Sequence, residues 1–386
     1  MADMKIGFYG HVKQYHNLKP EIDRAIHEVL ESGSYVLGPQ LVKFEQELAQ
    51  YMNAKETVGL NSGTDALLLT FLALGIGPGD EVITTSNTFF ATAEAIWLAG
   101  ATPVLVDIDP RTRNIDPPRI EGAITPRTRA LVPVHLYGLP ADMAAVSRIA
   151  RAHNLLVVED CAQAIGARGD SFSIGELSDA VCLSFIIQKN LGCFGDGGAI
   201  ATNNADLATA VRKLRNHGSL KRSHHSIGYN SRLDDLHAAV LRIKLKRVDE
   251  WTRLRQGLAS EYDRLLADLP LTLPYTPPGY RHVYHLYVVR LRHSDRDGHR
   301  GQSEQVDRNH HPHRLDDARH AVRRDVGTYR KRRLGADRGQ DQRMRDLELG
   351  PGPGNRLTGH PTLDEGPGIG FGDHVEHDAH EPVGVF

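Results

Sequence analysis

Lys189 stands between an apolar run and a glycine-rich loop, in the stretch SFIIQKNLGCFGDGGAI at positions 184–200. Protein cores exclude unpaired ammonium groups, so this lysine is either a surface residue after a strand or a buried amine kept for chemistry. A desolvated lysine near other polar groups has a lowered pKa and can act as a nucleophile and proton carrier. The residue type therefore indicates covalent or acid–base chemistry, provided that the rest of the chain supplies the partners.

A second candidate is the stretch Ser62-Gly63-Thr64, which precedes the apolar segment DALLLTFLALG and places Asp65 in the first turn of an expected helix. Backbone N–H groups at a helix N-terminus, together with two hydroxyl groups, can form a cradle for phosphate. The alternative is an ordinary helix N-cap. An isolated Ser-Gly-Thr stretch before a helix is more often such a cap than a phosphate site.

Two further stretches carry polar groups at the ends of expected elements. The apolar run LLVV ends in Glu159-Asp160. Carboxylates at the carboxyl end of a parallel strand lie where α/β sheets bind ligands, although an acid here can also cap the next helix. The stretch GYNSRLDDLHAA at 228–239 is a polar turn before a helical pattern, and its simplest interpretation is a helix start capped by Asn230 or Ser231.

These residues need a scaffold, and the chain up to about residue 291 predicts a mostly parallel α/β sheet, because apolar strand-like runs alternate with amphipathic helical stretches. A helix is expected over 20–33, with Ile22, Ile26, Val29 and Leu30 on one stripe and Gly33 as its end. The expected strands are 81–85, 102–109, 130–138 and 155–162, and the expected helices are 64–75, 91–100 and 141–154.

A helical period then runs from Leu233 to Tyr262 and predicts one long helix or two, followed by a strand over 282–291. Beyond Arg292 the periodicity is lost: residues 293–386 contain ten His, fourteen Arg and one Lys. This segment is interpreted as a disordered tail, a His-rich metal-binding tract or, preferably, the product of a reading-frame shift near Arg292.

Composition limits the class of function. The 386 residues carry a formal net charge of −2, which gives no global electrostatic reason to expect nucleic acid or an anionic membrane as a partner. The N-terminus has no long apolar stretch, and no run of about 18 apolar residues is present, so neither a signal peptide nor a membrane span is expected. Three unevenly spaced cysteines argue against a disulfide framework or a zinc site and fit a reducing cytoplasm.

Several motifs in a fixed order resemble the DegT/DnrJ/EryC1/StrS family of pyridoxal phosphate-dependent sugar aminotransferases, which have fold-type I. The matching stretches, from about residue 5 to 291, are SGSYVLGPQLVKFEQELAQYM, NSGTDALLL, TTSNTFFATAEAI, VEDCAQAIGA, KNLGCFGDGGAI and GYNSRLDDLHAA. The resemblance implies a seven-stranded, mostly parallel sheet in a large domain with an N-terminal helical segment (1–245), followed by a small domain that starts at 246–291. The aberrant segment 292–386 shows no match, although the family normally has a complete small domain there. The chain departs from the family at SFIIQK, which lacks the usual proline or glycine before the lysine, and at His237, where glutamine is common.

The resemblance implies that Lys189 forms the internal Schiff base with pyridoxal 5'-phosphate and moves the proton during transfer. It also implies that Phe89 stacks on the pyridine ring, that Asp160 pairs with the ring nitrogen as a second catalytic residue, and that Gln163 lies near the ring's oxygen or face. A protonated ring is the better electron sink.

The phosphate, by the same resemblance, is held by Gly63, Thr64 and Ser184, and by Asn230 of the neighbouring subunit. The last role implies a homodimer with shared active sites. The glycines of the loop after Lys189 are expected to let the backbone turn sharply and approach closely.

The implied reaction moves an amino group from an amino acid, usually glutamate, to a nucleotide-linked keto sugar. Relatives that dehydrate sugars carry His at the lysine position, so Lys189 argues against that branch. The sugar, the nucleotide, the carbon position and the pathway (antibiotic, surface polysaccharide or glycolipid) stay open. The alternative from another class is a non-catalytic remnant, a dimerising cofactor-binding protein with a damaged small domain; solubility and dimerisation of the full chain distinguish the two.

Overall fold

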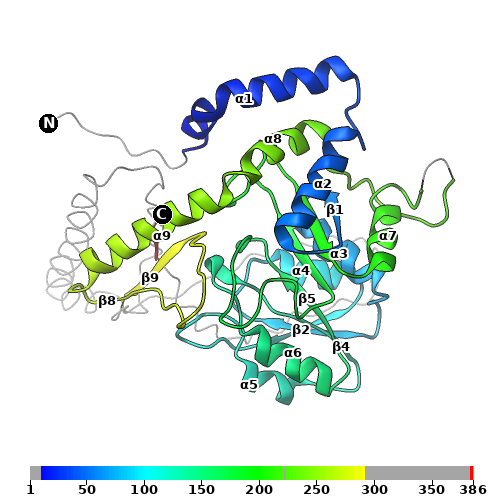
Figure 1. Cartoon of the computed structure of the whole chain (residues 1–386). Helices are drawn as coiled ribbons and strands as arrows, with labels where there is room; N and C mark the ends of the chain where they lie inside the picture. The colour runs from blue at the N-terminus through cyan, green and yellow to red at the C-terminus, as the bar shows by residue number, and fades with distance from the viewer. Residues whose placement is uncertain (1–9, 221–222, 292–382, 386) are drawn as a thin grey trace, which may run out of the picture. The chain divides into compact units, whose positions relative to one another are not determined.

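The computed structural model describes residues 10–220, 223–291 and 383–385 (Figure 1). The three interpretations of the segment after Arg292 concern residues that, except for 383–385, lie outside this part. Within it, none of the helices is both long and apolar enough to cross a membrane. The helical elements are α1 (His11–Ser32), α2 (Pro39–Met52), α3 (Gly63–Ala73), α4 (Ala91–Leu98), α5 (Pro117–Ile120), η1 (Glu121–Ala123), η2 (Leu136–Gly138), α6 (Met143–Ala152), α7 (Ala205–Leu214), α8 (Asp235–Leu245) and α9 (Val248–Leu266).

A seven-stranded sheet in the order β1-β7-β6-β5-β4-β2-β3 forms the centre of the fold. The chain links β6, β5, β4, β2 and β3 by parallel pairs, whereas β7 is antiparallel to both of its neighbours. The expected mostly parallel sheet is therefore confirmed. Its strands are β1 (Glu56–Leu60), β2 (Glu81–Thr85), β3 (Thr102–Val106), β4 (Thr128–Val132), β5 (Leu156–Asp160), β6 (Ala180–Ser184) and β7 (Gly198–Thr202).

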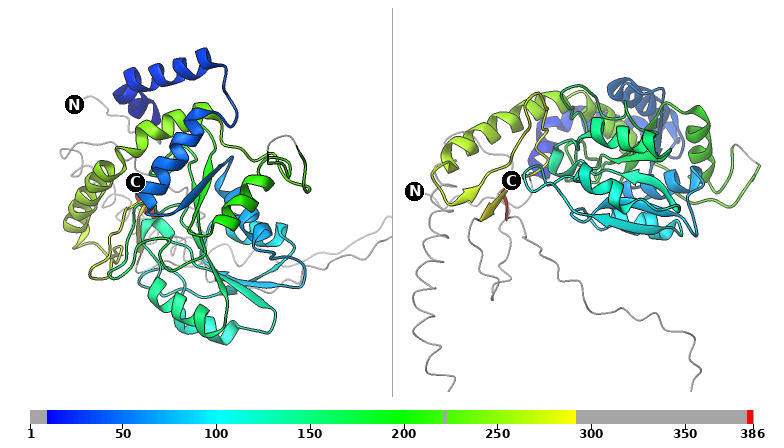
Figure 2. Two further views of the ribbon diagram at one scale, coloured as in Figure 1. Left: turned by 45° about the vertical axis from the view of Figure 1, so that its right-hand side comes forward. Right: turned by 90° about the horizontal axis from the view of Figure 1, so that it is seen from below.

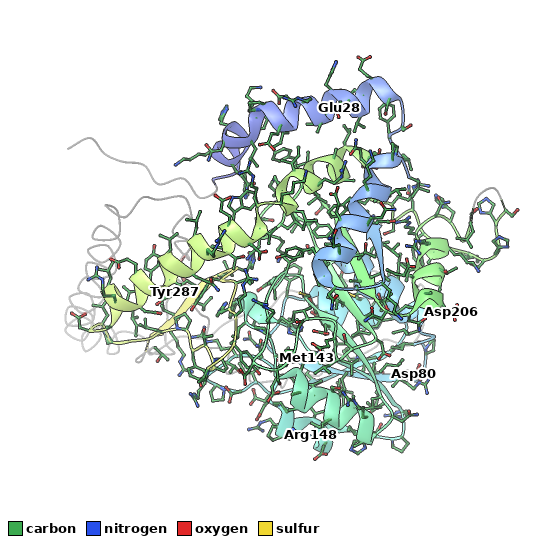
Figure 3. All side chains as sticks on the ribbon, viewed as in Figure 1. Glu28, Asp80, Met143, Arg148, Asp206 and Tyr287 are labelled. Carbon is green, nitrogen blue, oxygen red and sulfur yellow. The ribbon has the colours of Figure 1, made fainter. Side chains whose placement is uncertain are left out.

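Both faces of the sheet are buried, which explains why its strands are apolar runs instead of alternating patterns. Successive residues enter different cores: Val158 packs with α3, α4 and α7, while its neighbour Val157 packs with α6. The core on the second face continues over β6 and β7, where Leu183 packs with residues of α2 and α8. Met143 of α6, labelled in Figure 3, is fully buried in this layer.

Helix α1 begins at His11, nine residues earlier than the sequence pattern predicts, and Pro20 lies inside it. Gly33 ends the helix as predicted, in the left-handed conformation with φ 66°. The predicted stripe is only partly right: Ile22 and Val29 are buried, but Leu30 is 51% exposed. In Figures 1 and 2 α1 lies along α8, and Ile22 packs against Val240 of that helix.

The helical pattern from Leu233 forms two helices, α8 and α9. The prediction that Asn230 or Ser231 caps the first of them is wrong, because Asp234 occupies the N-cap position. Its neighbour Asp235 is fully buried and accepts hydrogen bonds from the backbone N–H groups of Gln40 (3.1 Å) and Leu41 (2.8 Å). A carboxylate at the first turn of α2 satisfies donors that have no partner inside the helix.

The expected strand over 282–291 is shorter than predicted, since only β9 (Tyr287–Leu291) is extended and paired, with β8 (Leu271–Thr272) and β10 (Val383–Val385). The preceding residues bend around η2: Tyr284 has φ 47°, and the Val283 N–H donates to the Gly138 carbonyl at 2.9 Å. Tyr287 (Figure 3) begins β9 fully buried, and its hydroxyl donates to Asp263 at 2.6 Å.

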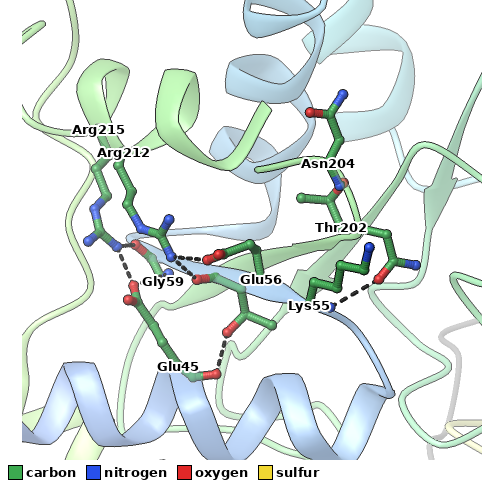
Figure 4. A network of polar contacts seen from close by, with 10 residues as sticks. Glu45, Lys55, Glu56, Gly59, Thr202, Asn204, Arg212 and Arg215 are labelled. Atoms are coloured by element: carbon green, nitrogen blue, oxygen red, sulfur yellow. Dashed lines mark hydrogen bonds and ion pairs between the residues drawn. The ribbon is translucent and has the colours of Figure 1, made fainter. Parts of the chain in front are cut away.

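A polar network fixes the edge strand β1, which leads into the start of α3 (Figure 4). Arg215 donates to Glu45 at 2.5 Å and to the Gly59 carbonyl at 2.7 Å, and the Gly59 N–H donates back to Glu45 at 2.8 Å. Arg212 pairs with Glu56 at 2.7 Å. These contacts tie β1 to α2 and α7 and so set the position at which the chain enters Ser62-Gly63-Thr64.

Candidate active site

The start of α3 packs closely against the ends of two neighbouring strands. Ser62 is the N-cap, and its hydroxyl accepts a hydrogen bond from the Asp65 N–H at 3.1 Å. A Cβ built on Gly63 would lie 2.7 Å from the Ser184 Cβ, and one built on Gly198 would lie 2.2 Å from the Ser62 carbonyl oxygen. Only glycine allows this approach, which brings the helix N-terminus, with its unpaired N–H groups, next to Ser184.

The structure shows the cap in Ser62-Gly63-Thr64, and the phosphate cradle stays a prediction. Ser62 does cap the helix, as the simpler alternative holds. Thr64, in contrast, lies half-buried in the first turn, beside Gly63 and therefore near Ser184. The region keeps the donors that an anion needs: helix N–H groups, the Thr64 hydroxyl and the Ser184 hydroxyl.

Asp160 is the last residue of β5 and is only 6% exposed. Its Oδ2 accepts a hydrogen bond from the Thr92 hydroxyl at 2.8 Å, and its Oδ1 accepts one from the Ala162 N–H at 3.1 Å. Thr92 is itself fully buried and bonds to the Thr88 hydroxyl at 2.8 Å. A carboxylate buried among donors is held in one orientation, and each of its oxygens can accept more than one hydrogen bond.

The neighbouring acid Glu159 has a different partner. Its Oε2 lies 2.7 Å from the His135 Nε2, and both side chains are fully buried. His135 Nδ1 accepts the Ala141 N–H at 3.0 Å, so the ring proton belongs on Nε2 and points at the carboxylate. Glu159 Oε1 also accepts from the Gly175 N–H at 2.8 Å. Glu159 therefore anchors the end of β5, and its use in this anchor distinguishes it from Asp160.

Gln163 lies three residues beyond Asp160, in the loop after β5. Its Oε1 accepts a hydrogen bond from the Tyr137 N–H at 2.6 Å. Tyr137 has φ 59°, and burial raises the pKa of its phenol above the ordinary value. The side-chain oxygen of Gln163 is thus engaged by η2, which leaves its amide N–H groups as the donors available to a ligand.

Lys189 lies in a compact loop between β6 and β7 and is half-buried. Its backbone N–H donates to the Ile186 carbonyl at 2.9 Å, which closes a turn over IIQK. The next residue, Asn190, is buried, and its Nδ2 donates to the Val283 carbonyl at 3.1 Å. The close packing expected of the glycines is confirmed at Gly192, where a Cβ would lie 2.6 Å from the Ile187 carbonyl oxygen.

Phe89 and Asn230 lie at the margin of this group. Phe89 is 72% exposed, and its carbonyl accepts the Thr92 N–H at 3.1 Å, which places it beside the residue bound to Asp160. Asn230 is exposed, and its carbonyl accepts from Asn61 Nδ2 at 3.4 Å, next to the start of α3.

The contacts thus bring the Gly63 backbone to Ser184. They connect the Phe89 backbone, through Thr92, to Asp160, but they do not place the Phe89 ring. The Asn230 contact with Asn61 uses the backbone carbonyl, so it brings the Asn230 side chain to none of the other predicted residues. Sequence reasoning missed Thr92 and His135. For Thr92 the only signal was a hydroxyl in the helix after Phe89.

A metal site is a separate possibility, and within the described ranges no group of three or more His, Cys, Asp or Glu side chains is arranged to hold an ion.

Comparison with known proteins decides the family. The sequence profile of the DegT/DnrJ/EryC1/StrS aminotransferase family matches residues 16–312. This chain belongs to that family. It is 51% identical over 283 residues to the dTDP-3-amino-3,4,6-trideoxy-alpha-D-glucose transaminase of Streptomyces venezuelae, covering 73% of this chain and 75% of that protein. It is 47% identical over 279 residues to the UDP-2-acetamido-2-deoxy-3-oxo-D-glucuronate aminotransferase of Pseudomonas aeruginosa, covering 72% and 78%.

Solved structures agree with this assignment. The S. venezuelae DesV crystal structure, in complex with a ketimine intermediate, superposes with a TM-score of 0.73 at 50% identity and covers 74% of this chain and 78% of that one. NtdA from Bacillus subtilis, with bound cofactor PMP, superposes with a TM-score of 0.68 at 38% identity and covers 72% and 64%. The fold is that of the fold-type I pyridoxal phosphate-dependent aminotransferases.

Proposed function

We propose that this chain is a pyridoxal phosphate-dependent aminotransferase that moves an amino group from an amino acid, with glutamate as the expected donor, to a nucleotide-linked keto sugar. Its relatives include transaminases of dTDP- and UDP-linked sugars. The observation that carries the proposal within this chain is the close contact of the α3 N-terminus, through Gly63, with Ser184 at the end of β6. Strand β6 leads into the Lys189 loop and pairs with β5, which ends in the buried Asp160.

The residues fit the cofactor. The close contact of Gly63 with Ser184, which a Cβ would prevent, holds the Ser184 hydroxyl beside the N-terminus of α3, where helix N–H groups can bind an anion. We therefore assign the phosphate to Gly63, Thr64 and Ser184. Bound pyridoxal phosphate would supply an electron sink for the substrate carbon.

The remaining groups act on the ring and the substrate. Lys189 would hold the cofactor through its side-chain amine and carry the proton to and from the reacting carbon. Asp160, with two donors already fixing its orientation, would face the ring nitrogen and keep it protonated. Phe89 offers an exposed aromatic face for stacking, and the Gln163 amide offers donors near the ring oxygen.

A homodimer is part of this proposal. Large apolar side chains are exposed on α4, on β3 and on the loop that enters α4, and a surface of this kind commonly binds a partner. Apart from Phe89, which is assigned to the ring, they are Phe90, Trp97, Leu98 and Leu105. We assign Asn230 to the phosphate of the neighbouring subunit. Three free, buried thiols support a reducing compartment, the cytoplasm, as the place of action.

The test is a visible spectrum of the purified full-length protein with pyridoxal phosphate, before and after borohydride, followed by mass spectrometry of the Lys189 peptide. We expect a yellow band that bleaches and the reduced cofactor on Lys189. Lys189→Ala should abolish the label, whereas Lys246→Ala, at an exposed lysine, should keep it. Loss of the band when glutamate is added would support glutamate as donor. A colourless or aggregated wild-type protein would contradict the proposal. A yellow, dimeric protein whose band no amino donor changes would favour the non-catalytic remnant.

A further inference from the structure

Lys244 is a lysine that the proposed chemistry does not use, although its side chain is fully buried in α8. A buried ammonium group is unfavourable unless other groups compensate for its lost hydration. In the described part of the chain Lys244 forms no ion pair. Burial lowers its pKa to about 8. An apolar side chain of similar length would fill the same space without the free-energy cost of desolvating an ammonium group. The amine is therefore expected to have a specific role.

The amine binds the loop that carries Lys189. Lys244 Nζ donates to the Gly192 carbonyl at 2.6 Å and lies 4.3 Å from the centre of the Phe194 ring. These are the two kinds of partner that suit a desolvated cation without a carboxylate: a carbonyl dipole and the negative face of an aromatic ring. Both partners come from the segment immediately after Lys189.

Gly192 transmits this contact to the turn of Lys189. The Gly192 Cα packs so tightly on the turn that a Cβ would lie 2.6 Å from the Ile187 carbonyl oxygen and 2.8 Å from that of Ile186. The Ile186 carbonyl is the acceptor of the Lys189 N–H. A shift of Gly192 would therefore disturb the turn that orients Lys189.

The loop has separate attachments on its other sides. Asn190 binds the Val283 carbonyl, and the Cys193 thiol donates to the Phe185 carbonyl at 3.1 Å. Phe194 packs edge-on against Tyr15 of α1 at 6.1 Å between ring centres. Helix α8 also contributes apolar packing to this segment, since Cys193 and Phe194 lie in clusters with Leu241 and Val240, and Lys244 adds a polar contact from α8 to the Gly192 carbonyl.

We propose that Lys244 is a positioning residue for Lys189: its buried amine holds the Gly192 carbonyl and the Phe194 ring, and thereby fixes the turn from which Lys189 reaches the cofactor. This inference deepens the proposed function and rests on it for the role of Lys189. The fixing of the loop itself is independent of the cofactor.

The first measurement is hydrogen–deuterium exchange of the cofactor-free, full-length protein, in peptides that cover 185–197. We compare the wild type with Lys244→Met, which keeps length and removes the amine, and with the control Lys246→Met, two residues away on the surface. We expect exchange in 185–197 to rise by about fivefold in Lys244→Met and to stay unchanged in the control. Equal exchange in both variants would overturn the proposal, whatever the cofactor does.

The second measurement uses bound pyridoxal phosphate. In Lys244→Met we expect about tenfold weaker binding and a shifted pH midpoint of the visible absorbance, because Lys189 is misplaced. A variant with wild-type affinity and midpoint would refute the positioning role. If the wild-type protein does not bind pyridoxal phosphate at Lys189, only the proposed function is contradicted. The exchange measurement still decides whether Lys244 fixes the loop. If Lys244→Met does not fold, Phe194→Leu takes its place, and we expect a smaller rise in the exchange of 185–197. Unchanged exchange in Phe194→Leu would again refute the proposal.

Discussion

Replacement of Glu159 by glutamine should destabilise the protein through one wrongly placed donor. The variant is isosteric, so packing is kept and only the hydrogen bonds change. The introduced amide can keep its oxygen toward the Gly175 N–H, but its N–H groups then face the proton on His135 Nε2. The histidine cannot relieve this by moving its proton, because Nδ1 already accepts the Ala141 N–H.

The magnitude follows from the burial of the pair, since both side chains have 0% exposure. An unsatisfied buried donor and the loss of a charge-assisted acceptor together give a decrease of about 2–4 kcal/mol in the free energy of unfolding. The measurement is urea denaturation followed by circular dichroism at fixed protein concentration. The matched control is Glu28→Gln, at an exposed glutamate on α1 (Figure 3), which should change the free energy by less than about 0.5 kcal/mol.

Two outcomes would refute this reasoning. The first is a Glu159→Gln midpoint equal to that of the control. The second is strict additivity with His135→Asn, because residues in one buried hydrogen-bond pair should show a coupling energy of about 0.5–3 kcal/mol. Since Glu159 precedes Asp160, the variant should also weaken cofactor binding, which a titration of visible absorbance measures.

Three further predictions concern single groups. Thr92→Val removes the hydroxyl that donates to Asp160 and should weaken pyridoxal phosphate binding by about tenfold in an absorbance titration. Thr92→Ser keeps the hydroxyl and should bind the cofactor as the wild type does. An equal loss of affinity in both variants would argue against the hydrogen bond. Gly63→Ala should weaken cofactor binding in the same assay, because the added methyl group meets Ser184. Gly122→Ala should leave binding unchanged, because a Cβ there has no atom within 4 Å. Equal affinities of the two variants would contradict the phosphate cradle. Burial lowers the pKa of His282 to about 3 from 6.5, so the unfolded state binds a proton between these values that the folded state does not. The contribution of neutral His282 to the free energy of unfolding is fully present above pH 6.5. It decreases as the pH is lowered, by about 2 kcal/mol at pH 5. His282→Asn should lose less stability than the wild type between pH 7.5 and 5 in urea denaturation, and parallel losses would exclude this cause.

The sequence predicted the sheet well, because strands buried on both faces are apolar runs that need no knowledge of their neighbours. It also predicted Asp160 at a strand end, where parallel topology places ligands. The segment 282–286 was misjudged as strand because its aromatic and β-branched residues favour that state locally, whereas packing against Gly138 bends it. Pro20 was taken as a helix start although α1 runs through it, which tertiary packing on α8 permits.

Thr92 and Lys244 could not be found from the pattern of the sequence. Both have side chains that are usually exposed in helices, and only the fold shows that they are fully buried and bound to distant residues. The roles of the site residues stay predictions, and the proposed labelling tests that of Lys189.

The three cysteines give the protein three reporters of local opening. Cys161 follows β5, Cys182 lies in β6 and Cys193 lies in the loop after Lys189, and all three are buried. Burial raises the pKa of each thiol, that of Cys193 to about 12. Because the thiolate is the reactive form, a thiol reagent modifies each cysteine only when its surroundings open. The order of labelling would therefore rank the stability of the sheet against that of the lysine loop, without any introduced probe.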